Sequence, residues 1–293
     1  MDERAALDLL GGVVGRAGDD AAVVDGQVVT TDMLHERTDF PPGTTRYTAG
    51  WRAVGASLSD VAAMGATATA AVAVYAAPEF DEDDLVDFVT GARDVCAAVG
   101  AEYVGGDLDS HTEFTVATTA LGRTDDPVHR DGATPGDLLC VTGTMGRSGA
   151  ALRLFEQGDT ERANDLFQFE PRVAAGQVLA AHATAMMDSS DGLARSVHQL
   201  SEASDCGFAV DFDAIPVADA VHDVAEDDED TRELACFFGE DFELVFTIPE
   251  SDLAAARENS PTPLSVIGQV TDPDEGITMD GEALPDRGFT HGE

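Results

Sequence analysis

Short apolar segments typical of strands alternate along this chain with longer segments of helical spacing, and this order restricts the fold more than any other feature. A helical stretch at about 45–64 is followed by a strand-like run at 67–76. A second helical pattern begins at Asp81, where acidic residues favour a helix N-terminus. Further strands are expected at 101–105 and 113–121. We therefore predict an α/β (α+β) protein with mixed sheets flanked by helices.

A segment rich in Pro, Gly and Asp, residues 124–137, is the best candidate for a linker. The chain has 293 residues, which is enough for two medium domains. We predict an N-terminal domain of residues 1–127 and a C-terminal domain of residues 136–293.

Local signals predict several further boundaries. A hairpin is expected to turn at Asp25-Gly26, and a second one at 279–283. Pro171 stands at a plausible first position of a helix. Strands are expected at 206–212 and 242–248.

The charge of the chain excludes several classes of function. It has 57 acidic and 16 basic side chains, a formal net charge of −41, and every basic residue is Arg. Without Lys there is no Walker-type P-loop and no Schiff base. Without clustered positive charge we expect no binding to nucleic acid or to an anionic membrane.

The acidic residues are interspersed among periodic apolar segments, and 43% of the chain is hydrophobic, so the composition is that of a folded protein. We interpret the surplus charge as halophilic adaptation, because molar salt screens repulsion between surface carboxylates. No signal peptide is read at the start, and the longest apolar run, 66–77, is too short to span a bilayer. Four scattered cysteines without a CxxC pair are typical of reduced thiols, so we expect a cytoplasmic protein.

Short acidic motifs lie where strands or helices are expected to end. They are GDDAAV (18–23), TTD (30–32), SLSDVAAMGA (57–66), GGD (105–107), MDSSDG (187–192) and GEDFE (239–243). Each alone is consistent with a turn or a cap, such as Ser189-Ser190 capping a helix. Together they supply hard oxygen ligands, so we predict bound Mg²⁺ bridging to phosphate oxygens that a Lys-free chain could not otherwise hold.

Other kinds of site fail on single residues. His35-Glu36 begins like the zinc motif HExxH, but position 39 is Asp39. An EF-hand beginning at Asp107 fails because Thr112 stands where the loop needs Gly. The segment 143–149 lacks the GxGxxG order of a dinucleotide site.

The motifs, in this order and with this spacing, resemble those of the thiamine-monophosphate kinase family, within the aminoimidazole-ribotide synthetase superfamily. The resemblance runs from about Gly18 to Phe289, and SDVAAMGA followed by GEDFELVFT is its most specific part. It implies two α/β domains, a homodimer formed by the N-terminal domains, ATP across the cleft of that dimer, and several Mg²⁺ ions.

The resemblance also implies roles for individual residues. The metal ligands it implies are Asp20, Thr30, Thr31, Asp32, Asp60, Asp107, Asp188 and Asp191. The nucleotide contacts are Gly106, Asp107, Arg130 and Ser190, and the substrate positions are Asp39, Glu240 and Phe289. The residues expected to carry catalysis are Asp32, Asp60, Asp107 and Arg130, with Arg130 as a bidentate phosphate contact.

The implied reaction moves the γ-phosphoryl group of ATP in line to the phosphate of thiamine monophosphate. The second pKa of a phosphate monoester is about 6, so the acceptor is already an anion and needs no general base. The protein has to offset repulsion between two anions and to align them.

The chain departs from the family pattern at Asp39, where the family has a substrate-contacting His, and we expect Asp39 to be a tolerated variant. His35 could replace that His only if the loop is rearranged. The alternatives are another enzyme of the superfamily, such as aminoimidazole-ribotide synthetase, and a non-catalytic paralogue that binds nucleotide or metal.

Overall fold

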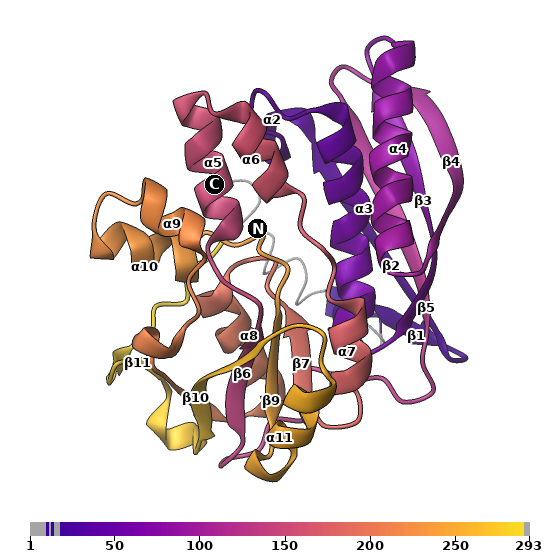
Figure 1. Ribbon diagram of the computed structural model, residues 1–293. Coiled ribbons are helices and arrows are strands. Elements are labelled where there is room, and N and C mark those ends of the chain that lie inside the picture. The colour runs from indigo at the N-terminus through magenta and orange to yellow at the C-terminus, as the bar shows by residue number, and fades with distance from the viewer. Residues whose placement is uncertain (1–9, 12, 15–17, 290–293) are drawn as a thin grey trace.

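The computed structural model describes residues 10–11, 13–14 and 18–289, and it contains two sheets that lie beside each other (Figure 1). The first sheet has five strands in the order β1-β2-β5-β3-β4. Its strands are β1 (Ala22–Val24), β2 (Gln27–His35), β3 (Thr67–Ala77), β4 (Glu102–Ser110) and β5 (Thr115–Arg123). All of them precede the candidate linker. The predicted hairpin at Asp25-Gly26 and the strand at 67–76 are confirmed.

The second sheet has seven strands in the order β12-β11-β8-β10-β6-β9-β7. Its strands are β6 (Leu138–Thr142), β7 (Ala185–Asp188), β8 (Gly207–Val210), β9 (Leu244–Ile248), β10 (Leu264–Thr271), β11 (Ile277–Met279) and β12 (Glu282–Ala283). Both sheets combine parallel and antiparallel pairs, so the prediction of mixed sheets is confirmed. The strand predicted at 242–248 begins only at Leu244, because Phe242 has a positive φ of 54° that a strand cannot accommodate.

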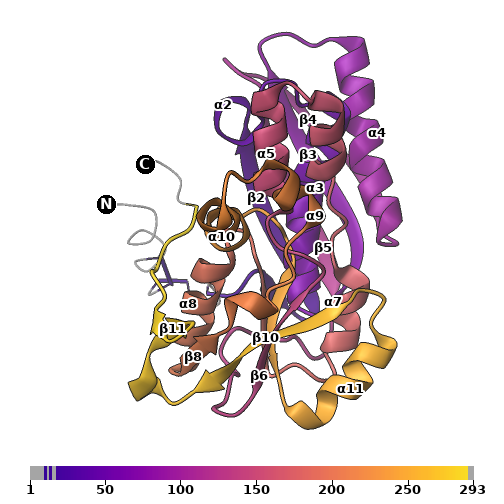
Figure 2. The ribbon, with the colours of Figure 1, turned by 60° about the vertical axis from the view of Figure 1, so that its left-hand side comes forward.

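Helices cover the sheets and their junction. The helices of the first half are α2 (Glu36–Asp39), α3 (Arg46–Ala63) and α4 (Glu82–Ala98). Those of the second half are α5 (Arg147–Gln157), α6 (Thr160–Phe167), α7 (Val173–Leu179), α8 (Leu193–Ser204), α9 (Asp219–Val224), α10 (Asp228–Cys236) and α11 (Glu250–Asn259). Helices α5, α6, α9 and α10 lie together near the N-terminal end of α3 (Figures 1 and 2). No helix among the described residues is long and apolar enough to cross a membrane.

Two expected caps are corrected. Helix α7 begins two residues after Pro171, with Arg172 as its N-cap, so Pro171 is not its first residue. Ser189 and Ser190 do not cap α8, because Gly192 is the N-cap and makes no side-chain cap. Asp81 does cap α4, and its side chain accepts hydrogen bonds from the backbone N–H groups of Asp83 and Asp84.

Helices α3 and α4 pack side by side against one face of the first sheet (Figure 1). Their backbones approach each other closely at two glycines. A Cβ atom on Gly50 would lie 2.1 Å from the carbonyl oxygen of Phe88, and one on Gly91 would lie 2.0 Å from that of Tyr47. Only glycine allows the two backbones to come this near. The position of α3 against the sheet therefore depends on these two residues.

The two halves share one hydrophobic core. Its buried residues include Ala62 and Met64 from α3 and its C-cap, together with Cys140, Phe246 and Leu264 from the second half. The segment 124–137 contains no helix or strand, as predicted, but it is anchored by a hydrogen bond from the Val128 N–H to the Met64 carbonyl. The halves are therefore packed as one body, and the domain boundaries at 127 and 136 stay a prediction.

Gly91→Ala tests the close packing of α3 and α4. We expect a loss of about 2 kcal/mol in the free energy of unfolding, because the contact is with backbone and outweighs the gain in helix propensity. Denaturant titration at constant salt measures it, with the exposed Asp87→Ala on the same helix as the control. An unchanged midpoint for Gly91→Ala would contradict the described helix contact.

Candidate active site

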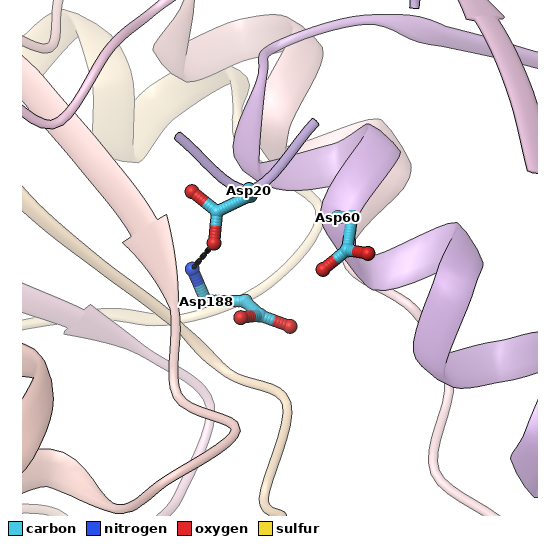
Figure 3. Close-up of side chains that lie close together, drawn as sticks. All are labelled: Asp20, Asp60 and Asp188. Carbon is cyan, nitrogen blue, oxygen red and sulfur yellow. Dashed lines mark hydrogen bonds between the residues drawn. The ribbon is translucent and has the colours of Figure 1, made fainter. Parts of the chain in front are cut away.

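Three carboxylates from distant parts of the chain meet between the two sheets. Asp20 precedes β1, Asp60 lies in the last turn of α3, and Asp188 ends β7. One oxygen of each lies within 4.8 Å of the others, and Figure 3 shows the three side chains pointing toward a common space. The structure thus brings together three of the predicted metal ligands.

Hydrogen bonds fix these groups in place. The Thr30 hydroxyl donates to Asp60 Oδ2 at 2.5 Å, and the Asp188 N–H donates to Asp20 Oδ1 at 3.4 Å. The side chain of Asp20 and the residue Asp188 are each 1% exposed. Within the described part of the chain, Asp188 Oδ2 has no hydrogen-bond donor.

Burial and mutual repulsion raise the pKa values of this cluster. The pKa of Asp188 rises to about 8, first because of burial and then because of the charge on Asp20. The pKa of Asp60 also lies well above its ordinary value, because of burial and the charges of Asp188 and Asp20. Buried carboxylates this close need a proton or a cation between them.

The cluster fits a hard divalent cation. All three side chains offer carboxylate oxygens, and the buried Asp188 Oδ2 remains without a donor among the described residues. Mg²⁺ prefers oxygen ligands of this kind and retains several waters or substrate oxygens. Asp20, Asp60 and Asp188 are the residues that would hold it.

Arg130 faces this cluster, but its contacts differ from the prediction. Its Nε and Nη2 donate to the two oxygens of Asp20, at 3.1 and 2.8 Å. One bidentate edge of Arg130 is thus occupied by Asp20, and its predicted contact with a phosphate stays a prediction. Asp19 accepts the Arg130 N–H at 2.9 Å and lies 2.7 Å from His129 Nδ1, so the GDD motif also fixes the loop that carries Arg130.

The predicted ligands Thr30, Thr31 and Asp32 lie on β2, and their side chains point to two different faces of the first sheet. Thr30 is buried on the face toward α3, and Asp32 lies on the same face because side chains alternate along a strand. The charge of Asp32 contributes to the raised pKa of Asp60, so it lies near the cluster. Thr31 points to the opposite face and donates to the Thr118 carbonyl, so its side chain does not face this cluster and its role as a metal ligand stays a prediction.

Gly106 and Asp107 lie on β4, at the edge of the first sheet. Two strands separate β4 from β2, which places the two strands about 14 Å apart. Asp107 is exposed and accepts a hydrogen bond from the Leu108 N–H. One copy of the chain therefore does not bring Asp107 to the three-carboxylate cluster, and the predicted roles of Gly106 and Asp107 stay predictions.

The motifs MDSSDG and GEDFE are joined through their backbones. The Ser190 carbonyl accepts from the Glu240 N–H at 2.6 Å, and the Ser189 carbonyl accepts from the Phe242 N–H at 3.0 Å. The Phe289 N–H donates to the Asp191 carbonyl at 2.9 Å. The structure thus brings the predicted residues Ser190, Asp191, Glu240 and Phe289 next to one another and next to Asp188.

Asp39 is a buried part of its own turn. It is 5% exposed, and its Oδ2 accepts hydrogen bonds from the His35 N–H at 2.6 Å and the Thr38 hydroxyl at 2.8 Å. The side chain of Asp39 is thus engaged within its own turn, and its place among the substrate positions stays a prediction. His35 Nδ1 lies 3.1 Å from the Thr115 hydroxyl. A cavity of about 800 Å³ lies beside this turn. Its walls include Thr38 and Phe40, the two neighbours of Asp39, but not Asp39 itself.

Sequence reasoning missed Arg52, which is 2% exposed and bonded to Glu240. One signal was available, because Arg52 is the only charged residue between Arg46 and Asp60 in a helix of small and apolar side chains. It also missed Asp19, whose role follows only from the proximity of the 124–137 segment.

Comparison with known proteins identifies the family. Residues 18–124 match the family "AIR synthase related protein, N-terminal domain", and residues 134–280 match its C-terminal domain. The thiamine-monophosphate kinase of Halobacterium salinarum is 67% identical over 291 residues, which are 99% of this chain and 100% of that one. This chain belongs to the thiamine-monophosphate kinase family.

Solved structures agree with this family. AaThiL complexed with AMPPCP and TMP has a TM-score of 0.89 and 27% identity, covering 99% of this chain and 97% of that one. Thiamine-monophosphate kinase from Stenotrophomonas maltophilia has a TM-score of 0.82 and 32% identity, covering 91% and 90%. The predicted two-part fold of the superfamily is confirmed.

The raised pKa of Asp188 predicts how the stability of the folded protein changes with pH. The folded, metal-free protein keeps a proton that the unfolded chain releases, so the contribution of Asp188 to stability falls as pH rises from about 4 to about 8. A divalent cation binds the ionised form, so stabilisation by Mg²⁺ should increase over the same range.

Thermal unfolding of the wild type and Asp188→Asn at pH 6 and pH 9, at constant molar KCl, tests this. Without metal, Asp188→Asn should gain stability relative to the wild type at pH 9. Added Mg²⁺ should stabilise the wild type and the control below, but not Asp188→Asn. Asp126→Asn, an exposed change in the 124–137 segment, is the charge-matched control. Equal Mg²⁺ stabilisation of all three proteins would contradict the metal site.

Proposed function

We propose that this chain transfers the γ-phosphoryl group of ATP directly to the phosphate of thiamine monophosphate, forming thiamine diphosphate and ADP. The observation that carries this proposal is the buried cluster of Asp20, Asp60 and Asp188, in a chain 67% identical to a thiamine-monophosphate kinase. The structure of AaThiL with AMPPCP and TMP supports the same pair of substrates.

In this reaction the bond between the γ-phosphorus and the β,γ-bridging oxygen of ATP breaks, and a bond from an acceptor phosphate oxygen to that phosphorus forms. The electron pair of the broken bond leaves with ADP. Near neutral pH the acceptor is largely a dianion, so no side chain has to remove a proton. The protein has to bring two anions together and align them.

The residues around the cluster supply these functions. Mg²⁺, when bound, neutralises charge on phosphate oxygens and orients them. Asp20, Asp60 and Asp188 hold it, Thr30 orients the Asp60 carboxylate, and Asp32 and Asp191 add negative charge nearby. Arg130 keeps its Nη1 edge for a phosphate while Nε and Nη2 hold Asp20, since a guanidinium has five N–H donors.

The nucleotide base is proposed to bind beside Gly106 and Asp107. A cavity of about 490 Å³ opens there between β4 and α4, and its walls include Tyr75, Phe88 and Tyr103. Apolar and aromatic walls with a few polar groups are typical of sites for flat ligands. Because β4 lies about 14 Å from β2 within one copy, ATP bound here reaches a carboxylate cluster most directly across a dimer.

We therefore propose a homodimer formed through the uncovered face of the first sheet. Four large apolar side chains on this face, which we call the outer face, are 37–52% exposed: Val29, Met33, Val74 and Leu121. The strand registers place them on one side of the sheet, opposite α3 and α4. An exposed apolar face of this kind is typical of an interface between proteins.

We further propose that the chain works in the cytoplasm of a salt-adapted cell. The net charge of −41 and the Halobacterium salinarum relative support this. Molar KCl, which screens this charge, is therefore the appropriate medium for assays of the protein.

Incubation with ATP, Mg²⁺ and thiamine monophosphate should yield ADP and thiamine diphosphate in equal amounts. Asp60→Asn should lose at least about 100-fold in turnover, since one of three metal-holding charges is gone, yet remain folded. Asp126→Asn should retain full turnover. Full activity of Asp60→Asn would contradict the proposed metal site.

The same assay separates the alternatives. ADP without thiamine diphosphate would indicate another acceptor, as in an aminoimidazole-ribotide synthetase. No turnover at any salt concentration would indicate a non-catalytic nucleotide- or metal-binding protein.

Met33→Asp together with Val74→Asp should convert the dimer to a folded monomer, because two charges would be buried on each side of the interface. Sedimentation velocity in molar KCl measures the change. Val86→Asp, on the exposed side of α4, is the control and should remain dimeric. A wild type that sediments as a monomer would contradict the proposed interface.

A further inference from the structure

Arg52 is a buried cation whose orientation is fixed by contacts within the protein. It lies on α3 and is 2% exposed. Its Nη1 donates to the Phe167 carbonyl at 3.0 Å, and its guanidinium carbon lies 3.6 Å from the centroid of the Phe167 ring. A planar guanidinium held on one edge and against an aromatic face has a fixed orientation.

The other edge of the guanidinium points to the loop that contains GEDFE. Nη2 donates to Glu240 Oε2 at 2.9 Å, and it lies 3.2 Å from both the Glu240 carbonyl oxygen and the Ser148 hydroxyl. The Ser148 hydroxyl also donates to the Glu240 carbonyl, at 2.6 Å. Arg52 therefore binds both the backbone and the side chain of Glu240.

Glu240 is held from the other side as well. Its backbone has a positive φ of 59°, and its N–H donates to the Ser190 carbonyl beside Asp188 and Asp191. Its side chain is 18% exposed, and within the described residues Arg52 is the only donor to its carboxylate, through Oε2. Oε1 accepts no hydrogen bond among the described residues and belongs to a partly exposed side chain, so it is accessible to a donor on a ligand.

We propose that Arg52 is a positioning residue that orients the Glu240 carboxylate toward the ring end of the acceptor, an inference that rests on the proposed function. Thiamine monophosphate carries an amino group on its pyrimidine and a positive charge on its thiazolium ring, whereas its phosphate goes to the metal cluster. A carboxylate with one oxygen fixed by Arg52 offers the other to that amino group. Arg52 itself does not touch the substrate.

A lysine in this position would keep the charge but not the geometry. A single ammonium group cannot donate along two edges, as Arg52 does to the Phe167 carbonyl and to Glu240. The contact with Glu240 would therefore be less well oriented even where the ion pair is retained.

The test compares Arg52→Met, Arg52→Lys and Glu240→Gln with the wild type in molar KCl. Arg52→Met should raise the KM for thiamine monophosphate about tenfold or more, the effect of one charge-assisted hydrogen bond, with the KM for ATP within about twofold. Arg52→Lys should give a smaller increase. Arg153→Met, which removes a half-exposed Arg paired with Asp230, is the matched control and should change neither KM.

Two further measurements distinguish positioning from a general loss of structure. The effects of Arg52→Met and Glu240→Gln on the KM for thiamine monophosphate should be less than additive in the double variant, because both changes act on the same contact. An acceptor analogue with an oxo group in place of the pyrimidine amino group should be used less well than thiamine monophosphate by the wild type. Arg52→Met should reduce that discrimination about tenfold.

The proposal would be overturned by equal increases in the KM values for ATP and thiamine monophosphate, or by additive effects in the double variant. Unchanged discrimination between thiamine monophosphate and the oxo analogue would also overturn it. If Arg52→Met does not fold, Arg52→Lys decides by the same KM comparison, with an unchanged KM for thiamine monophosphate counting against it. A wild type that forms no thiamine diphosphate overturns the proposed function. A wild-type enzyme that is active while its Arg52 variants show no selective change overturns only the role of Arg52.

Discussion

Asp20, Asp60 and Asp188 repel one another, and the elements that carry them have to be held in place against this repulsion. Three acidic side chains placed within 4.8 Å of one another are unfavourable unless a cation or protons lie between them. The fold offsets this cost with a core shared by both halves, which fixes the ends of α3 and β7. Thr30 and Arg130 then hold two of the carboxylates by hydrogen bonds. A more flexible scaffold would let the three groups separate.

The second half of the site depends on backbone rather than side-chain contacts. The turns of MDSSDG and GEDFE exchange hydrogen bonds, and Glu240 and Phe242 adopt positive φ values of 59° and 54°. Buried side chains stabilise this strained loop: Asp241 accepts the N–H groups of Gly146 and Ser148, and burial raises its pKa to about 7. The loop is thus positioned by the N-terminus of α5 and by Arg52 of α3.

Most elements of the fold could be predicted from the sequence, because helical spacing and turn residues are local signals. The limits of α3, the Asp81 cap and the hairpin at Asp25-Gly26 are examples. The order of strands is not local, so nothing in GGD indicated that two other strands lie between Asp107 on β4 and strand β2. The contact between Arg130 and Asp20 could not be predicted for the same reason, because it joins residues 110 positions apart. Thr31 could have been separated from Thr30 by strand alternation alone.

Helix α3 carries both Arg52 and Asp60 and is straight and buried along most of its length (Figure 1). The two residues are eight positions apart in the helix, a rise of about 12 Å. The spacing between the carboxylate cluster and the Glu240 carboxylate is therefore set by one helix. For the acceptor proposed above, this spacing would have to match the distance between its phosphate and its ring, so the length of a molecule would matter for binding as well as its charge.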